Sequence, residues 1–203
     1  MNPGGVHRNR VLRRHDDRVQ RSRLEGVIEF TPARFADDRG HLSEVFNAER
    51  FQTLGLPVLF AQENESRSIA AGTVRGLHLQ VGAHAQGKLV RCVSGSIVDV
   101  AVDLRRSSPT FTDHVAVRLD AQDGAQLWIP PGFAHGFCTL EPHTVVQYKL
   151  TTQWVPSAER SLRWNDPSLG IEWPVGPEAA ILSQKDREAP TLAEFGEDAE
   201  VFS

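Results

Sequence analysis

The chain has 203 residues, of which 40% are hydrophobic and 24% charged, and its formal net charge is −4. These values are ordinary for a globular protein with one full core. No segment approaches the roughly 20 apolar residues that a membrane span requires. Cys92 and Cys138 lie within apolar runs and have no C-x-x-C spacing. We therefore expect buried, reduced thiols in a cytoplasmic protein.

The charge is unevenly distributed along the chain. Residues 1–23 contain seven arginines and two aspartates, so they carry a net charge of +5, against −9 for the remainder. A basic arm can contact nucleic acid or a membrane surface. Because this arm has no long apolar run, it is not a secretory signal. We expect a poorly ordered extension over residues 1–24, with no nucleic-acid or membrane partner, followed by one domain over residues 25–203.

In chain order, short strands and turns dominate the predicted elements. The first part of the chain predicts a strand at Gly26–Phe30, a turn at Asp37–Gly40, an alternating segment at His41–Phe46 and a helix at Glu49–Leu54. Further strands are predicted at Val58–Gln62, Lys88–Val93, Ile97–Asp103, His114–Leu119, Gln126–Ile129, Gly136–Leu140 and Thr144–Leu150. Many short strands separated by turn residues predict a β-sandwich or barrel. The segments Trp164–Pro174 and Val175–Pro190 predict a cover of loops and short helices over that barrel.

Two histidine segments resemble the paired signatures of the cupin barrel. One has the spacing G-x5-H and ends at His78, and the other has the spacing G-x5-P-x-G-x2-H and ends at His135. In metal-binding cupins a second His follows the first by two residues, and a Glu follows shortly after. Here Gln80 replaces that His, and no Glu occurs before Gly95. The resemblance implies an all-β, cupin-type jelly-roll β-barrel with a few short helices at the C-terminal end and without its metal.

The alternation of side chains along strands assigns polar residues to the interior of this barrel. With a closed barrel, His78, Lys88, His135 and Tyr148 can line one cavity. Charged side chains are rarely buried without a partner or a function. The sequence therefore predicts a polar cavity built from a base, an ammonium group and a phenol.

Ten motifs, in order, extend the resemblance to a family. They are Asp38-Arg39-Gly40, Arg75–Gln80, Gln86–Cys92, Asp99–Arg105, Ser108–Phe111, Gln126–Pro130, Gly132–Phe137, Tyr148-Lys149, Trp164–Pro167 and Ser183–Asp186. Together they are similar to the dTDP-4-dehydrorhamnose 3,5-epimerases, which act on dTDP-4-keto-6-deoxyhexoses such as dTDP-4-keto-6-deoxyglucose. The match runs from about Gly26 to Leu192 and leaves the basic arm outside.

The chemistry of this family explains the residues in the cavity. Epimerisation beside a ketone removes a proton from one face and returns one to the other, so it needs a base and an acid. It also needs a cation or donor at the enolate oxygen. The resemblance implies that His78 is the base, that Asp186 is its partner, that Tyr148 is the acid and that Lys88 stabilises the enolate. It implies no cofactor and no metal.

The resemblance also implies a set of substrate contacts. Arg39 and Arg75 match positions that bind the pyrophosphate, for which the forked guanidinium is suited. Other implied contacts are Glu44, Gln62, Asn64, His135, Trp154 and Lys185. In this family an N-terminal strand crosses to a second subunit. A homodimer is therefore implied, in which Arg39 and Glu44 serve the neighbour's pocket.

The chain departs from the family pattern at Trp154. Family members that invert both carbons commonly carry a second phenol six residues after the acid, where this chain has an indole. Loss of the hydroxyl and a larger ring lead to the hypothesis that the enzyme acts mainly at C3, as in pathways to antibiotic sugars. Gln147, at a position that is usually apolar, is expected to point out of the barrel.

Three alternatives remain from the sequence. A metal-dependent cupin oxygenase would hold its cation with His78, His84 and His135, but the ammonium of Lys88 would repel that cation. A dTDP-keto-sugar 3,4-isomerase shares the fold and the histidine base, although the motifs around Lys88 and Asp186 favour the epimerase. A non-catalytic nucleotide-sugar binder would need the arginines but not the base, its partner and the phenol.

Other prominent residues have structural interpretations. Asp99 and Asp103 alternate with apolar residues, so we expect them to pair with arginines or to face water. Asp166 competes with Asp186 as a catalytic carboxylate, but a structural turn is the favoured interpretation. Trp128 is expected in the core.

Overall fold

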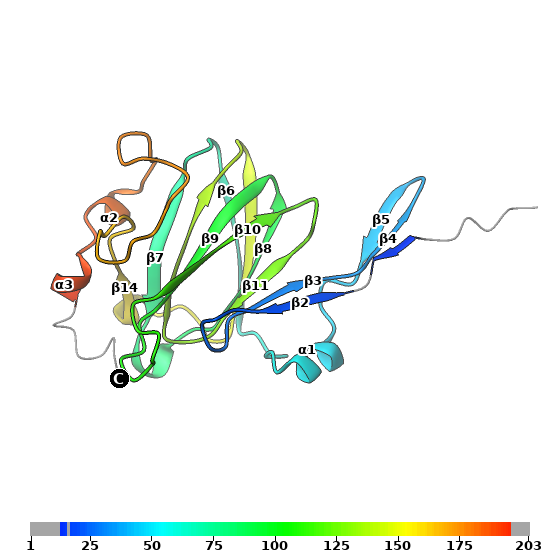
Figure 1. Cartoon of the computed structure of the whole chain (residues 1–203), viewed down its shortest axis with the longest axis horizontal. Coiled ribbons are helices and arrows are strands. Elements are labelled where there is room, and N and C mark those ends of the chain that lie inside the picture. Colours follow the sequence, from blue (N-terminus) through cyan, green and yellow to red (C-terminus); the bar gives the residue numbers. More distant parts are fainter. Residues whose placement is uncertain (1–12, 16, 196–203) are drawn as a thin grey trace, which may run out of the picture.

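The computed structural model describes residues 13–15 and 17–195, and its regular structure consists mostly of strands. Two antiparallel sheets face each other in a flattened barrel (Figure 1). In spatial order, the larger sheet contains β2 (Arg18–Arg21), β3 (Ile28–Thr31), β11 (Gln126–Ile129), β8 (Lys88–Ser94), β13 (Thr144–Leu150) and β6 (Gln62–Ser68). The smaller contains β10 (His114–Asp120), β9 (Ser96–Asp103), β12 (Phe133–Thr139), β7 (Val74–Gln80) and β14 (Glu159–Ser161). The predicted all-β fold is confirmed.

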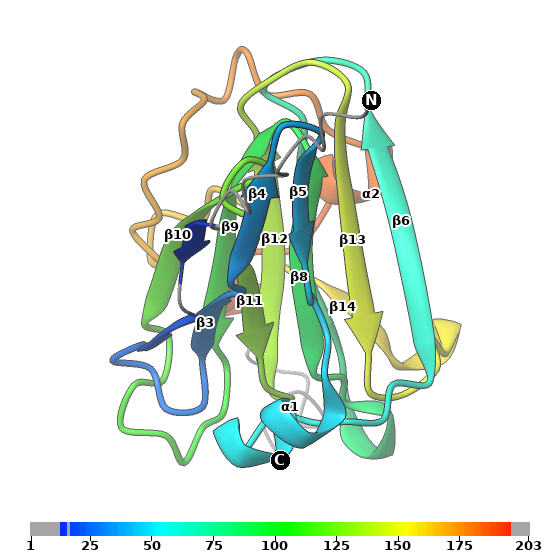
Figure 2. The ribbon, with the colours of Figure 1, turned by 90° about the vertical axis from the view of Figure 1, so that its right-hand side faces the viewer.

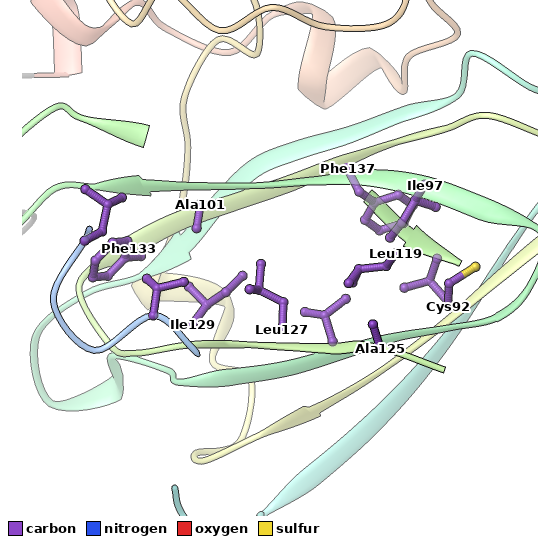
Figure 3. Close-up of a cluster of buried hydrophobic side chains, with 13 residues drawn as sticks. Cys92, Ile97, Ala101, Leu119, Ala125, Leu127, Ile129, Phe133 and Phe137 are labelled. Carbon is purple, nitrogen blue, oxygen red and sulfur yellow. The ribbon is translucent and has the colours of Figure 1, made fainter. Parts of the chain in front are cut away.

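Apolar side chains fill much of the space between the two sheets (Figure 3). Because successive side chains of a strand alternate between its faces, Ile97 and Ala101 of β9 point across the gap toward Leu127 of β11. Burial of each large apolar side chain contributes about 1.5–3 kcal/mol, so this cluster fixes how the sheets face each other. Cys92 belongs to the cluster, and both it and Cys138 are buried and free, as predicted.

The outer face of the smaller sheet is covered by the C-terminal part of the chain (Figure 1). Leu79 of β7 packs there with Leu162 and Leu169. Trp173 Nε1 donates to the backbone oxygen of Trp164 at 2.7 Å, and the two rings meet edge to face. Short helical segments complete the cover: η2 (Pro156–Ala158), α2 (Gln184–Arg187) and α3 (Leu192–Phe195). The predicted cover of loops and short helices is confirmed.

Helix α1 (Ala48–Leu54) packs at one end of the larger sheet, on its outer face (Figure 2). Its Phe51 side chain belongs to the same buried cluster as Phe30 and Trp128. Trp128 is buried, as expected. The helix begins at a side-chain cap from Asn47 and ends at Gly55, whose φ of 75° favours glycine. The helix predicted at Glu49–Leu54 is confirmed.

A hairpin stands away from the barrel (Figure 1). It consists of β4 (Arg34–Asp37) and β5 (Gly40–Ser43), with β1 (Arg13–His15) paired to the other edge of β4. Its turn is closed by a hydrogen bond from the backbone N–H of Arg39 to Asp37 Oδ1 at 2.9 Å. The predicted turn is therefore present, and it carries Arg39 far from the interior of its own barrel.

Part of the segment expected to be poorly ordered is strand. Strand β2 pairs with β3, and β1 pairs with β4. An edge strand offers unpaired N–H and C=O groups, and β2 satisfies those of β3. The remainder of the predicted extension, residues 1–12 and 16, lies outside the described residues.

One predicted strand is wrong. Residues 58–61 are not strand, and β6 begins only at Gln62. Strand β6 has the sequence QENESRS, with no apolar side chain. Its inward face carries the polar side chains Gln62 and Asn64, so the apolar pattern that predicts a strand is absent.

Candidate active site

Strands β7 and β12 approach closely where they carry the two signature histidines. His78 and His135 are paired across these strands. Beside them, a Cβ on Gly76 would lie 2.5 Å from Gly136 Cα, and Gly76 has a φ of 123°. A Cβ on Gly136 would lie 2.8 Å from a backbone oxygen of β7. Only glycine fits at these two positions, so the backbone itself sets the spacing of the histidines.

His78 forms a hydrogen-bonded pair with Asp186 of α2. His78 Nε2 lies 2.5 Å from Asp186 Oδ1. Ser183 Oγ donates to the other carboxylate oxygen at 2.8 Å and accepts from the Asp186 N–H. Burial raises the pKa of Asp186, but the hydrogen bonds from His78 and Ser183 outweigh burial and hold this pKa below its usual value. The carboxylate therefore stays charged and orients the ring, leaving His78 Nδ1 for the cavity.

Lys88 brings a positive charge to the same place. Its side chain is 7% exposed, and Nζ donates to the backbone oxygen of His78 at 3.0 Å. Burial lowers the pKa of Lys88 to about 8, partly opposed by the negative charge of Asp99. At neutral pH the ammonium is therefore charged but poorly hydrated, a state in which it interacts strongly with a nearby oxyanion.

A second His–Asp pair, which the sequence did not predict, lies beside the first. His135 Nε2 is 2.7 Å from Asp99 Oδ1, and both side chains are buried. Burial lowers the pKa of His135 despite the opposing attraction of Asp99. The expectation that Asp99 pairs with arginine or faces water is wrong, whereas Asp103 does pair with Arg105. The signal in the sequence that could have indicated this pair is an aspartate that faces inward within an otherwise apolar strand.

Tyr148 lies on the neighbouring strand β13 and faces the interior. It is partly buried and packs against the central apolar cluster. Across β13 it is paired with Val90 on one side and Asn64 on the other. Leu150, two residues on, is paired with Lys88. Tyr148 is thus on the same inner face as Lys88, one strand away. Gln147 points to the other face, as predicted, and bonds Glu65.

Gln62, Asn64 and Trp154 form one connected group at the end of the barrel. Gln62 Nε2 donates to Asn64 Oδ1 at 2.9 Å, and Gln62 Oε1 accepts from the Trp154 backbone N–H at 2.8 Å. The Trp154 residue is 49% exposed. These three predicted contacts are therefore brought together, with an indole at the rim.

Other predicted contacts lie farther from the His78 pair. Arg39 pairs with Asp37 on the hairpin, and Glu44 pairs with Arg50. Arg75 is exposed at the start of β7, where it donates to Ser68 Oγ at 3.3 Å. Lys185 adjoins Asp186 and pairs with Glu159 of β14 at 2.7 Å. Within one chain, Arg39 and Glu44 are not brought to the cavity.

Asp166 has the structural role that the sequence favours. Its carboxylate accepts from Ser168 Oγ at 2.6 Å and from the Leu192 backbone N–H at 2.6 Å. It ties the cover to α3 and does not face His78. Asp186 is thus the carboxylate that reaches the base.

Two features of the described residues bear on the alternatives. In the part of the chain that the structure describes, no group of three or more His, Cys, Asp or Glu side chains is arranged to hold a metal ion. His78 and His135 each direct Nε2 to a carboxylate instead. Among the described helices, none is long and apolar enough to cross a membrane.

Comparisons with known proteins agree with this geometry. Residues 21–194 match the family model for dTDP-4-dehydrorhamnose 3,5-epimerase. A protein of that name from Pseudomonas aeruginosa is 48% identical over 91% of this chain and 99% of its own length. A dTDP-4-dehydrorhamnose 3-epimerase from Streptomyces niveus is 37% identical over 84% of this chain and 82% of its own length.

Among solved structures, an epimerase from Legionella pneumophila in complex with dTDP-4-keto-L-rhamnose has a TM-score of 0.85. It is 40% identical, and the match covers 92% of this chain and 97% of the other. The chain is thus a cupin-type epimerase, an enzyme of the isomerase class. It belongs to the dTDP-4-dehydrorhamnose 3,5-epimerase family. The predicted epimerisation of a dTDP-linked keto-sugar is confirmed.

Proposed function

We propose that this chain inverts one or both carbons beside the C4 ketone of dTDP-4-keto-6-deoxyglucose, without metal or cofactor, by proton removal and return through an enolate. The observation that carries the proposal is the hydrogen bond between His78 and Asp186, with Lys88 bonded to the same residue of β7. It combines a base held in one tautomer with a cation for the enolate oxygen. A non-catalytic binder needs neither.

Each residue has a distinct role in the proposed reaction. His78 Nδ1 takes the proton on the carbon beside the ketone, and Asp186 stabilises the imidazolium that forms. The Lys88 ammonium stabilises the negative charge that moves to the ketone oxygen. Tyr148 returns a proton to the opposite face, since its phenolic hydroxyl is a proton donor. Arg75 and Lys185 bind the diphosphate and sugar end of the substrate.

The test is NMR of the product formed from dTDP-4-keto-6-deoxyglucose by the wild type and by His78→Ala. We expect inversion with the wild type and almost none with the variant. His114→Ala, which changes a partly buried histidine at the start of the edge strand β10, is the matched control and should retain activity. A substrate left unchanged by the wild type would sink the proposal.

We further propose that inversion occurs mainly at C3. The support is Trp154, whose backbone N–H is bonded to Gln62 and whose indole lacks the hydroxyl of a phenol. The experiment is turnover in deuterium oxide, followed by counting deuterons at each carbon. Two deuterons per product and inversion at both carbons would refute the single-centre version. Trp154→Tyr should increase exchange at C5.

The active form that we propose is a homodimer in which the hairpin enters the partner's pocket. The support is that the hairpin stands away from its own barrel (Figure 1) while carrying Arg39. Leu42 on the hairpin is 73% exposed and Leu59 is 82% exposed, which leaves apolar surface for a second subunit.

The compartment that we propose is the cytoplasm, consistent with two buried free thiols.

Subunit mixing tests this arrangement. Arg39→Ala and His78→Ala each disable a pocket, but a hybrid dimer with crossed hairpins has one pocket with both residues intact. An equal mixture, exchanged through mild denaturation, should recover about a quarter of wild-type activity, since half of the dimers are hybrids. If each hairpin serves its own subunit, the mixture stays inactive.

A further inference from the structure

Gln80, at the position of the second histidine of metal-binding cupins, is a buried amide with every hydrogen-bonding group in use. Its side chain is 3% exposed. Nε2 donates to the backbone oxygens of His84 and Gln153, at 3.1 and 3.2 Å. Oε1 accepts from the backbone N–H of Val155 at 2.6 Å. Two of these three bonds join β7 to residues more than 70 positions away in the chain, Gln153 and Val155.

Two of these partners flank Trp154. The Gln153 oxygen and the Val155 N–H are bonded to Gln80, while the Trp154 N–H between them is bonded to Gln62. Gln80 belongs to the smaller sheet and Gln62 to the larger sheet. Side chains from both sheets therefore fix the backbone of three consecutive residues, and the half-exposed indole is attached to the middle one.

The segment that carries Trp154 is irregular, and its first two residues, Thr151 and Thr152, are hydrogen-bonded to residues 84–87. Residues 151–155 form neither helix nor strand. Leaving a buried donor or acceptor unpaired costs about 1–3 kcal/mol per group, so loss of the Gln80 amide would release the segment to find other partners. The end of the barrel at Trp154 is thus held by an amide two residues from the proposed base.

We propose that Gln80 is a positioning residue, which holds Trp154 at the rim of the pocket and so determines substrate affinity. This rests on the proposed function, in which Trp154 contacts the substrate. Gln80 touches neither the reacting carbons nor the imidazole of His78 and acts only through the 153–155 backbone. The position of a metal ligand in related barrels serves here to orient a binding residue.

The test is a double-mutant cycle between Gln80→Met and Trp154→Ala, measured by steady-state kinetics on dTDP-4-keto-6-deoxyglucose. Methionine has similar size but cannot make the three bonds. We expect Gln80→Met to raise KM about tenfold and to change kcat less than about twofold. In the Trp154→Ala background the same change should alter KM less than about twofold, because residues that act through each other are not additive.

Thr144→Val is the matched control for loss of a buried side-chain bond. Thr144 Oγ1 donates to the backbone oxygen of Glu141 at 2.8 Å, at the opposite end of β13. This variant should lose stability without any change in KM. Gln80→Glu is made in parallel, because it keeps an acceptor for Val155 but no donors, and it should show the same dependence on Trp154.

Three results would overturn the proposal: an unchanged KM, an equal rise of KM in both backgrounds, or a loss confined to kcat. The last would mean that Gln80 acts through His78 on its own strand. All three results require that the wild type is active. If the proposed function is wrong, the wild type itself is inactive. The two failures are therefore distinguishable.

Discussion

The two His–Asp pairs have the same chemistry in different surroundings. The His78 side chain is 29% exposed, and its carboxylate partner comes from the C-terminal cover. The His135 side chain is 7% exposed, and its partner comes from the adjacent strand β9. The histidine of the first pair is partly exposed, while the second pair is enclosed.

This difference supports the proposal that His78 is the base and that His135 is a fixed hydrogen-bonding group. A general base must contact its substrate and must tolerate becoming charged. Burial lowers the pKa of His135, so its imidazole stays neutral when Asp99 accepts from Nε2. His78 is paired with a carboxylate whose pKa is held low by His78 and Ser183 against the effect of burial. Only the first pair is suited to take and release protons.

The largest expected effect distinguishes the two histidines directly. His78→Ala should lower kcat by about 10³–10⁴, the range for loss of a general base. His135→Ala should lower kcat/KM by about tenfold, through weaker substrate contact. Both are measured by product NMR at saturating and limiting substrate. Equal losses in kcat would mean that the two pairs share the proton transfer.

The next largest effect concerns the ammonium group of Lys88. Lys88→Met should lower kcat about 10²–10³-fold, because one donor to the enolate oxygen is lost. It should also stabilise the fold at pH 7 by up to about 3 kcal/mol. The lowering of the Lys88 pKa from 10.5 to about 8 corresponds to this free energy, which is the cost of burying the charge.

The sign of the stability effect follows from the same pKa. Below pH 8 the lysine is charged in both folded and unfolded chains, so the gain from methionine is complete. Between pH 8 and 10.5 the folded chain has released its proton and the unfolded chain has not, so the gain declines. Urea unfolding of the wild type and of Lys88→Met at pH 7 and pH 10 measures this gain in stability. A methionine variant that is less stable at pH 7 would contradict this.

Replacement of the two carboxylates should have smaller and different effects. Asp186→Asn should lower kcat at least about 100-fold, because the amide no longer stabilises an imidazolium. Asp99→Asn should lower kcat less than about tenfold, since its histidine stays neutral throughout. Circular dichroism melting of both variants controls for misfolding. A larger kcat loss for Asp99→Asn would reverse the assigned roles.

The smallest effect is a shift in the alkaline limb of the pH profile. Activity should fall as the pH rises through about 8, where Lys88 loses its proton. The negative charge of Asp99 raises the Lys88 pKa, so Asp99→Asn should move this limb to lower pH by less than about one unit. An upward shift would show that Asp99 does not act on Lys88.

The sequence predicted the barrel and α1 because the residues that form turns are local signals, and the ordered motifs implied the His78–Asp186 pair through the family resemblance. It missed β6, whose inward side chains are polar where they line the cavity. It also missed the Asp99–His135 pair, because these residues are 36 positions apart and meet only through the register of β9 and β12.

The network around Gln80 could not be predicted for a related reason. Its partners are backbone atoms of Gln153 and Val155, and a backbone atom leaves no mark in a sequence. The sequence shows that position 80 holds no histidine to bind a metal. It does not show which groups the Gln80 amide binds instead.

The close approach of Gly76 and Gly136 limits how this site can diversify. Any side chain at either glycine meets main-chain atoms of the opposite strand. The separation of His78 and His135 therefore cannot be widened by gradual substitution along β7 and β12. We therefore expect a change of sugar preference in this chain to require exchange of other side chains, such as the one at position 154, around two histidines whose spacing stays fixed.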